Sequence, residues 1–174
     1  MGISLNTYKE QALQRLIKEA TNEIFDSAPF KADFNIERSQ EGYSTERFED
    51  PAGNTIRIIF HSISGEYFEL DFTFNGSSFG RFETNYSIKQ YSQLLKTVAA
   101  AVSQFLKEVR PKAIKFEGVE AFKKIALRTS KEGQKSRVYD QFITQLKNDT
   151  EYSIDRQEDG AFNLIKKPIK QYEQ

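Results

Sequence analysis

Helical spacing of hydrophobic residues marks the longest element that the sequence predicts. Apolar side chains recur every three or four residues from Ile88 to Val109, which is typical of a helix with one buried stripe. Ser87 and Gln90 form a Ser-x-x-Gln capping box in front of this stripe, and Pro111 follows its end. We therefore predict a helix over residues 87–109 and expect it to organise the core.

Two further segments show the same spacing. The first follows Thr7-x-x-Glu10, a possible capping box, and predicts an N-terminal helix over about residues 7–25. The second is KSRVYDQFITQLKN, residues 135–148, where Ser136 can cap a helix and Tyr139 falls on the apolar stripe. We expect the ring of Tyr139 to be buried and its hydroxyl to lie near solvent.

Between residues 31 and 74 the period changes to two, which indicates β-strands. The clearest pair lies in TIRIIFHSISGEYFELDFTF. A two-residue loop at Ser64-Gly65 would place the two apolar rows on opposite faces of the hairpin. We therefore predict a three-residue loop, Ile63-Ser64-Gly65, with Gly65 left-handed. This register pairs Phe60 with Phe68, Ile58 with Leu70 and Ile56 with Phe72 on one face, and Arg57 with Asp71 and His61 with Tyr67 on the other.

The later segments predict one parallel strand pair. AIKFEG, residues 113–118, is a short apolar strand after the long helix. Because a crossover through a helix joins parallel strands, strands 66–74 and 113–118 are expected to run parallel. YSIDRQEDGAFNLIKK then predicts a hairpin that pairs Ile154 with Leu164. The predicted fold class is α+β, with a mixed, mainly antiparallel sheet, one parallel crossover and an N-terminal helix.

Composition excludes several classes of protein. The length of 174 residues fits a single domain, 1–174, with a basic C-terminal tail over 166–174. Without cysteine the chain forms no disulfide, thiolate zinc site or cysteine nucleophile. No apolar run approaches the roughly 20 residues of a membrane span, and the N-terminus lacks the apolar stretch of a signal peptide. We therefore expect no membrane contact.

The order of these elements resembles the GNAT (N-acetyltransferase) fold, in which a long helix joins two parallel strands that splay apart. Two segments, VSQFLKEVRPKAIKFEG and KSRVYDQFITQL, are similar to small, mostly uncharacterised proteins of tailed bacteriophages with a GNAT-like domain. The resemblance covers about residues 30–168. It implies a protein of the host cytoplasm or the virion.

The resemblance also implies where a cofactor and an acid would lie. In active acetyltransferases a loop resembling Q/R-x-x-G-x-G/A precedes the long helix and holds the pyrophosphate of acetyl-CoA on bare N–H groups. Here that region is NGSSFGRFETNYSIKQ, in which Gly76 and Gly80 lie earlier than the glycines of the family loop. The candidate contacts for the cofactor are Ser87, at the start of the helix, and Gly80. Tyr139 falls where active members place the tyrosine that protonates the departing thiolate. We predict no cofactor, and acetyl-CoA only if the chain is an acyltransferase.

The pattern of the other titratable residues favours structural roles over catalysis or metal binding. Ser62, His61 and Asp71 cannot form a triad, because neighbouring strand residues point to opposite faces. Glu69 and Asp71 share their predicted face with Arg57, which favours a salt-bridged surface and no metal site.

Charge is distributed unevenly along the neutral chain. Residues 107–137 hold ten Lys/Arg and four Asp/Glu, whereas residues 37–86 hold nine acids and four bases. The basic segment indicates either a solvated face or a contact with a phosphate or an acidic protein patch. Its loop KKIALRTSKEGQKSR, residues 123–137, lacks the interleaved aromatic residues of a single-strand binder, so we do not expect nucleic acid. The candidate contact residues are Lys123, Lys124, Arg128, Lys131, Lys135 and Arg137.

Three hypotheses follow. The first is a non-catalytic phage protein of GNAT-like fold that contacts a phage or host protein. The second is an acyl-CoA-dependent N-acyltransferase with an altered cofactor loop and Tyr139 as its acid. The third is a nucleic-acid-binding accessory protein. The sequence leaves the oligomeric state open.

Overall fold

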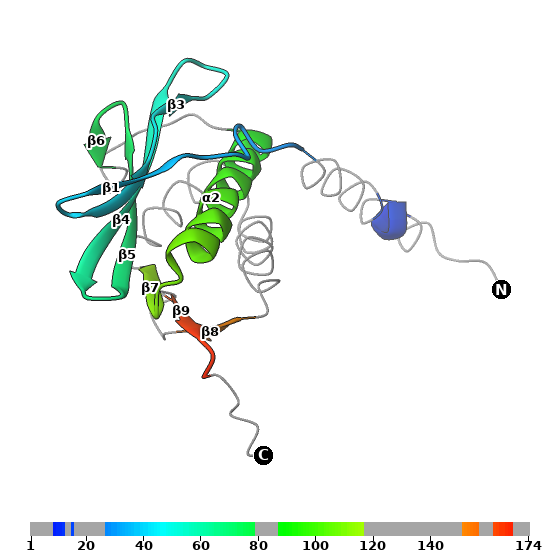
Figure 1. Cartoon of the computed structure of the whole chain (residues 1–174). Helices are drawn as coiled ribbons and strands as arrows, with labels where there is room; N and C mark the ends of the chain where they lie inside the picture. Colours follow the sequence, from blue (N-terminus) through cyan, green and yellow to red (C-terminus); the bar gives the residue numbers. More distant parts are fainter. Residues whose placement is uncertain are drawn as a thin grey trace.

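The computed structural model describes residues 9–12, 15, 27–78, 87–116, 151–156 and 162–168, and the statements below concern this part of the chain. Within it a long helix, α2, lies across one face of a sheet (Figure 1). The helix spans Ile88–Val109. The strands are β1 (Ile36–Ser39), β2 (Gly42–Thr45), β3 (Phe48–Glu49), β4 (Thr55–Ser64), β5 (Tyr67–Phe74), β6 (Ser77–Ser78), β7 (Ala113–Phe116), β8 (Tyr152–Arg156) and β9 (Phe162–Lys166).

The strand order confirms the predicted fold class at the level of α+β. The order is β1-β2-β4-β5-β7-β9-β8, with β3 also paired to β4 and β6 to β5. Among the described pairs, β5 and β7 are parallel and the others are antiparallel. The predicted parallel pair is therefore confirmed, as is the pairing of Ile154 with Leu164 in the last hairpin. Residues 9–12 and 15 are helical, and the rest of the predicted helix 7–25 lies outside the described residues.

The boundaries of α2 agree with the sequence signals. Ser87 is its N-cap, and Ser87 and Gln90 form the predicted capping box. Arg110 ends the helix in the left-handed conformation, with φ of 53°, just before Pro111. The chain then enters β7 after only a short connection.

Side chains of α2 also hold an extended segment, residues 27–35. Lys96 and Gln93 donate hydrogen bonds to the carbonyls of Ser27 and Ala28, and Thr97 accepts one from the Phe30 amide. Further along, the amide of Gln104 pairs with both the N–H and the carbonyl of Phe34. These bonds satisfy several backbone groups of a segment that is not assigned to a strand.

The central hairpin corrects the predicted register. The loop contains two residues, Gly65 and Glu66, because Ser64 pairs with Tyr67, and a bulge at Ile63 absorbs one extra residue. The buried pairs are therefore Ile56 with Phe74, Ile58 with Phe72 and Phe60 with Leu70. On the other face, Arg57 lies opposite Thr73 and His61 opposite Glu69, so both predicted pairs were wrong.

The prediction for Gly65 is confirmed, since its φ is +57°. A two-residue loop keeps both apolar rows on one face only because the bulge restores the alternation that the loop would otherwise break. The observed loop differs from both loops weighed from the sequence, Ser64-Gly65 and Ile63-Ser64-Gly65, because neither included a bulge in the preceding strand.

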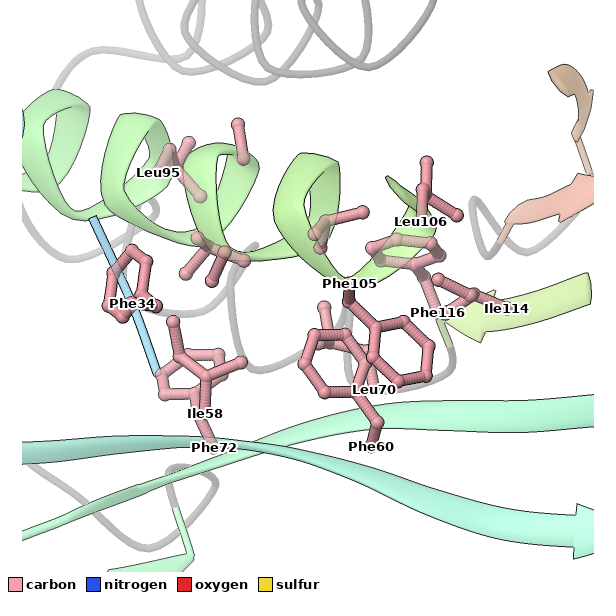
Figure 2. Close-up of a cluster of buried hydrophobic side chains, with 14 of the residues drawn as sticks. Phe34, Ile58, Phe60, Leu70, Phe72, Leu95, Phe105, Leu106, Ile114 and Phe116 are labelled. Atoms are coloured by element: carbon pink, nitrogen blue, oxygen red, sulfur yellow. The ribbon is translucent and has the colours of Figure 1, made fainter. Parts of the chain in front are cut away.

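The core lies between α2 and the sheet (Figure 2). Phe105 of α2 stacks on Phe60 of β4, with ring centroids 3.9 Å apart and an angle of 7° between the planes. Phe68 and Tyr43 meet the same ring edge-on at 5.2 and 5.5 Å. Leu95, one of the apolar residues of α2, is 2% exposed. The odd-numbered positions of β4 and β5 consequently point to the opposite face, which holds the candidate site.

Candidate binding site on the outer face of the sheet

We call the face opposite α2 the outer face. Its centre is formed by Arg57, Ile59 and His61 of β4 with Asp71 and Thr73 of β5, which alternate with the buried residues of the same strands. These five side chains are half-buried or exposed. The centre of the outer face is therefore polar, apart from Ile59.

Two hollows lie side by side on this face. One, the Arg57 hollow, has a volume of about 410 Å³ and is lined by Arg47, Thr55, Arg57, Ile59, Thr73, Asn75 and Gly76. The other, of about 380 Å³, is lined by Ser39, Gln40, Glu41, Ser44, Arg57, Ile59 and His61. Because Arg57 and Ile59 line both hollows, together they form a trough along β4. Each volume lies in the range typical of small-molecule sites.

Arg57 is held in place by the neighbouring strand. Its Nη2 donates a hydrogen bond of 2.7 Å to Ser44 Oγ, and its Nε donates one of 3.3 Å to the Thr45 carbonyl. Thr45 Oγ1 in turn accepts from the Ile58 amide. The predicted ion pair between Arg57 and Asp71 was wrong, and within the described chain Arg57 contacts uncharged acceptors.

Asp71 interacts with His61 instead. His61 Nε2 lies 3.8 Å from Asp71 Oδ2, and both side chains are more than a third exposed. This distance is too long for a hydrogen bond, so it gives no general base or acid pair in this conformation. Ser62 lies opposite Phe68 in the ladder and not beside His61 on the outer face, so these residues form no triad.

Glu46, the carboxylate next to Arg47, is occupied elsewhere. Its Oε1 lies 3.0 Å from Lys31 Nζ, and its Oε2 accepts a 2.7 Å hydrogen bond from the Asn35 amide. Burial alone would raise the pKa of Glu46, but the hydrogen bond from Lys31 and those from backbone amides lower this pKa below its ordinary value. Glu46 therefore ties residues 31–35 to the end of β2 and does not neutralise Arg47.

An apolar row lies at one end of the outer face. Tyr67 of β5 pairs with Ala113 of β7, which pairs with Ile165 of β9, and Ile63 lies in the adjacent bulge. Ile63, Tyr67 and Ile165 are 55%, 50% and 39% exposed, and they are the large exposed hydrophobic residues of the described chain. Strands are about 4.8 Å apart, so Tyr67 and Ile165 lie roughly 10 Å from each other.

The N-terminus of α2, the predicted cofactor contact, is closed by its own capping box. The Gln90 amide donates to Ser87 Oγ at 3.2 Å, and the Ser87 amide donates to Gln90 Oε1 at 2.9 Å. Two of the N–H groups that a pyrophosphate would use are thus already bonded. The other predicted site residues, Gly80, Lys123, Lys124, Arg128, Lys131, Lys135, Arg137 and Tyr139, lie outside the described residues.

The remaining site classes were checked over the same residues. Among them, no cluster of His, Cys, Asp and Glu could hold a metal ion. No helix in the described chain is long and apolar enough to cross a membrane. No family model matches the sequence, and no curated protein or solved structure matches it significantly.

Sequence reasoning missed the Arg57 hollow because of the register. In the predicted register Arg57 faced Asp71, and an arginine opposite an aspartate indicates a simple surface ion pair. Shifted by two residues, Arg57 faces Thr73 and has no acidic partner across the strand. The bulge at Ile63 causes this shift, and it has no strong residue signature in the sequence.

Proposed function

We propose that this chain is a non-catalytic protein of GNAT-like fold that acts through contacts with a phage or host protein, in the virion or the host cytoplasm. The observation that carries the proposal is the apolar row of Ile63, Tyr67, Ala113 and Ile165 at the end of the outer face. Large apolar side chains grouped on a surface are typical of protein interaction sites, and tyrosine is enriched where such sites bind tightly.

The pairing of β5 with β7 supports the GNAT-like part of the proposal. Within the described residues, the two parallel strands pair through Tyr67–Glu69 and Ala113–Lys115. Further along β5, β6 pairs with Thr73 and Phe74. Two parallel strands that are joined by a long helix and pair near the start of each strand fit the arrangement that the family resemblance implies.

The capping box at the start of α2 supports the proposal that the chain is non-catalytic. A cofactor pyrophosphate would have to compete with the Ser87–Gln90 hydrogen bonds for the same N–H groups. Lys89 in the first turn offers a cation there, but a single exposed lysine does not replace a cradle of bare amides.

Two experiments test the proposal. Calorimetric titration with acetyl-CoA should give no binding heat, and a micromolar dissociation constant would favour the acyltransferase alternative. Interaction partners should then be compared between the wild-type chain and Tyr67→Asp, with Arg38→Gln as the control on the opposite face. A partner held by the wild type and the control but lost from Tyr67→Asp supports the apolar row as the contact. Equal retention by all three would refute this assignment.

A further inference from the structure

The Arg57 hollow carries two positive charges that the described chain does not neutralise. Arg47 and Arg57 both line it, and none of its described lining residues is acidic. Neither arginine forms an ion pair with a described carboxylate. Arg47 lies between β2 and β3, one residue before the pair that Phe48 forms with Ile56, and it lines the same hollow as Arg57. Two like charges held close together repel each other, and a bound anion would offset this repulsion.

Arg57 is already oriented to receive such an anion. Ser44 Oγ and the Thr45 carbonyl accept two of its five N–H groups, and within the described structure the other three have no protein acceptor. An arginine whose fork is fixed in advance loses less conformational freedom on binding an oxyanion.

Three carboxylates close to these strands in the sequence are bound to other groups. Glu46 is bound by Lys31 and the Asn35 amide. Asp50 accepts from the amides of Ala52 and Asn54, and Asp71 accepts from the Phe72 amide and lies beside His61. In the described structure none of these three carboxylates forms an ion pair with Arg47 or Arg57.

We propose that the Arg57 hollow binds the phosphate group of a small molecule. Three N–H groups of Arg57, the guanidinium of Arg47 and the hydroxyls of Thr55 and Thr73 offer more donors than the two oxygens of a carboxylate can use. A phosphate presents three acceptor oxygens and pairs bidentately with arginine. The volume of about 410 Å³ leaves room beyond the phosphate, where Ile59 supplies an apolar contact.

A polyanion is disfavoured at this position. The strands around the hollow belong to residues 37–86, in which acids outnumber bases by nine to four. Exposed Glu37, Glu41 and Glu49 belong to this region. A nucleic-acid backbone would meet these charges on leaving the hollow, whereas a single phosphate group fits within a hollow whose described lining residues include no carboxylate.

Backbone amide NMR titrations at constant ionic strength test the proposal. The probes are inorganic phosphate, phenyl phosphate and benzoate, with chloride as the balancing anion. We expect saturable shifts at the amides of Thr55, Arg57 and Thr73, strongest with phenyl phosphate because its ring contacts Ile59. If inorganic phosphate binds as tightly as phenyl phosphate, the site takes the free ion. Benzoate binding as tight as that of phenyl phosphate overturns the assignment to phosphate.

Arg47→Gln is the decisive variant, because Arg47 is exposed and makes no described contact that folding needs. It should weaken phenyl phosphate binding roughly tenfold, as expected for loss of one charge-assisted hydrogen bond. Arg38→Gln removes the same charge from the opposite face, and it should change the affinity less than about twofold. The proposal would be overturned if the wild-type chain showed no saturable shifts with phenyl phosphate. It would also be overturned if Arg47→Gln left the affinity for phenyl phosphate unchanged.

Discussion

Strands β4 and β5 have two faces whose side chains make different kinds of contact. Toward α2 they place Ile56, Ile58 and Phe60, which are fully buried. On the outer face the intervening residues, such as Arg57 and His61, contact partners of specific chemistry. Shifting β4 by two residues relative to β5 keeps the apolar side chains on the same face. The same shift gives each side chain on the polar face a different partner on the opposite strand. Apolar matching therefore determines the faces, and hydrogen bonds and charges distinguish between registers.

The largest effect that follows from this comparison concerns Phe105. Its ring is completely buried, stacks on Phe60 and meets Phe68 and Tyr43 edge-on. Phe105→Ala should lower the free energy of unfolding by about 3–5 kcal/mol, because it leaves a cavity among three other rings. Denaturant unfolding measures this change.

Ile59→Ala is the matched truncation on the outer face. Ile59 is only half-buried, so its loss should cost about 1 kcal/mol. Equal costs for the two substitutions would contradict the comparison, because they would show that the outer face is packed as tightly as the face under α2.

A second prediction concerns Gly42, where β2 lies against β4. Its φ is +140°, and a Cβ at this position would lie 2.1 Å from the Phe60 carbonyl oxygen and 2.9 Å from the Ser62 amide nitrogen. Gly42→Ala should therefore destabilise the fold by roughly 2–4 kcal/mol, from the backbone conformation and the clash together. Thermal and denaturant unfolding of the variant test this.

Gly53→Ala separates the two causes. Gly53 also has a positive φ, of +83°, but a Cβ there would meet no atom within 4 Å. Only the conformational cost applies, about 1–2 kcal/mol. If the two variants unfold at the same denaturant concentration, β2 can move away from β4 without cost, and the close approach at Gly42 does not constrain the sheet.

Local signals predicted the parts of the fold that depend on short stretches of chain. The capping box at Ser87, the left-handed Gly65 and the pairing of Ile154 with Leu164 each follow from a few neighbouring residues. The parallel pairing of β5 and β7 followed from a handedness rule. The register of the central hairpin failed because a bulge costs little and has no strong residue signature.

The candidate site was less predictable for the same reason. Arg57 and Arg47 are ten residues apart in the sequence, and only the step from β2 to β3 brings both to one hollow. Their lack of acidic partners depends on where Glu46 and Asp71 point, which is a tertiary property. By contrast, the apolar row has a visible sequence signal, because Ile63 and Tyr67 flank a turn where polar residues are usual.

The smallest predicted effect lies at the margin between the two faces, where Glu46 binds Lys31 and the Asn35 amide. The pKa of Glu46 in the folded chain is below its ordinary value of 4.5. Its contribution to stability is therefore complete above the pKa of the unfolded chain, and it is lost as the pH falls through the lower folded pKa. Because Glu46 is partly exposed, the contribution should be below about 1 kcal/mol.

Glu46→Gln should accordingly have a lower free energy of unfolding than the wild type at neutral pH. In acid the free energies of unfolding of the two proteins should become equal. Denaturant unfolding of both proteins between neutral pH and pH 3 measures the difference, which should shrink below the ordinary pKa of 4.5. Glu37→Gln is the control, because Glu37 is exposed and forms no ion pair in the described structure. A pH-independent difference for Glu46→Gln would mean that its amide hydrogen bond, and not its charge, ties residues 31–35 to the sheet. The polar margin would then be as insensitive to pH as the apolar layer under α2.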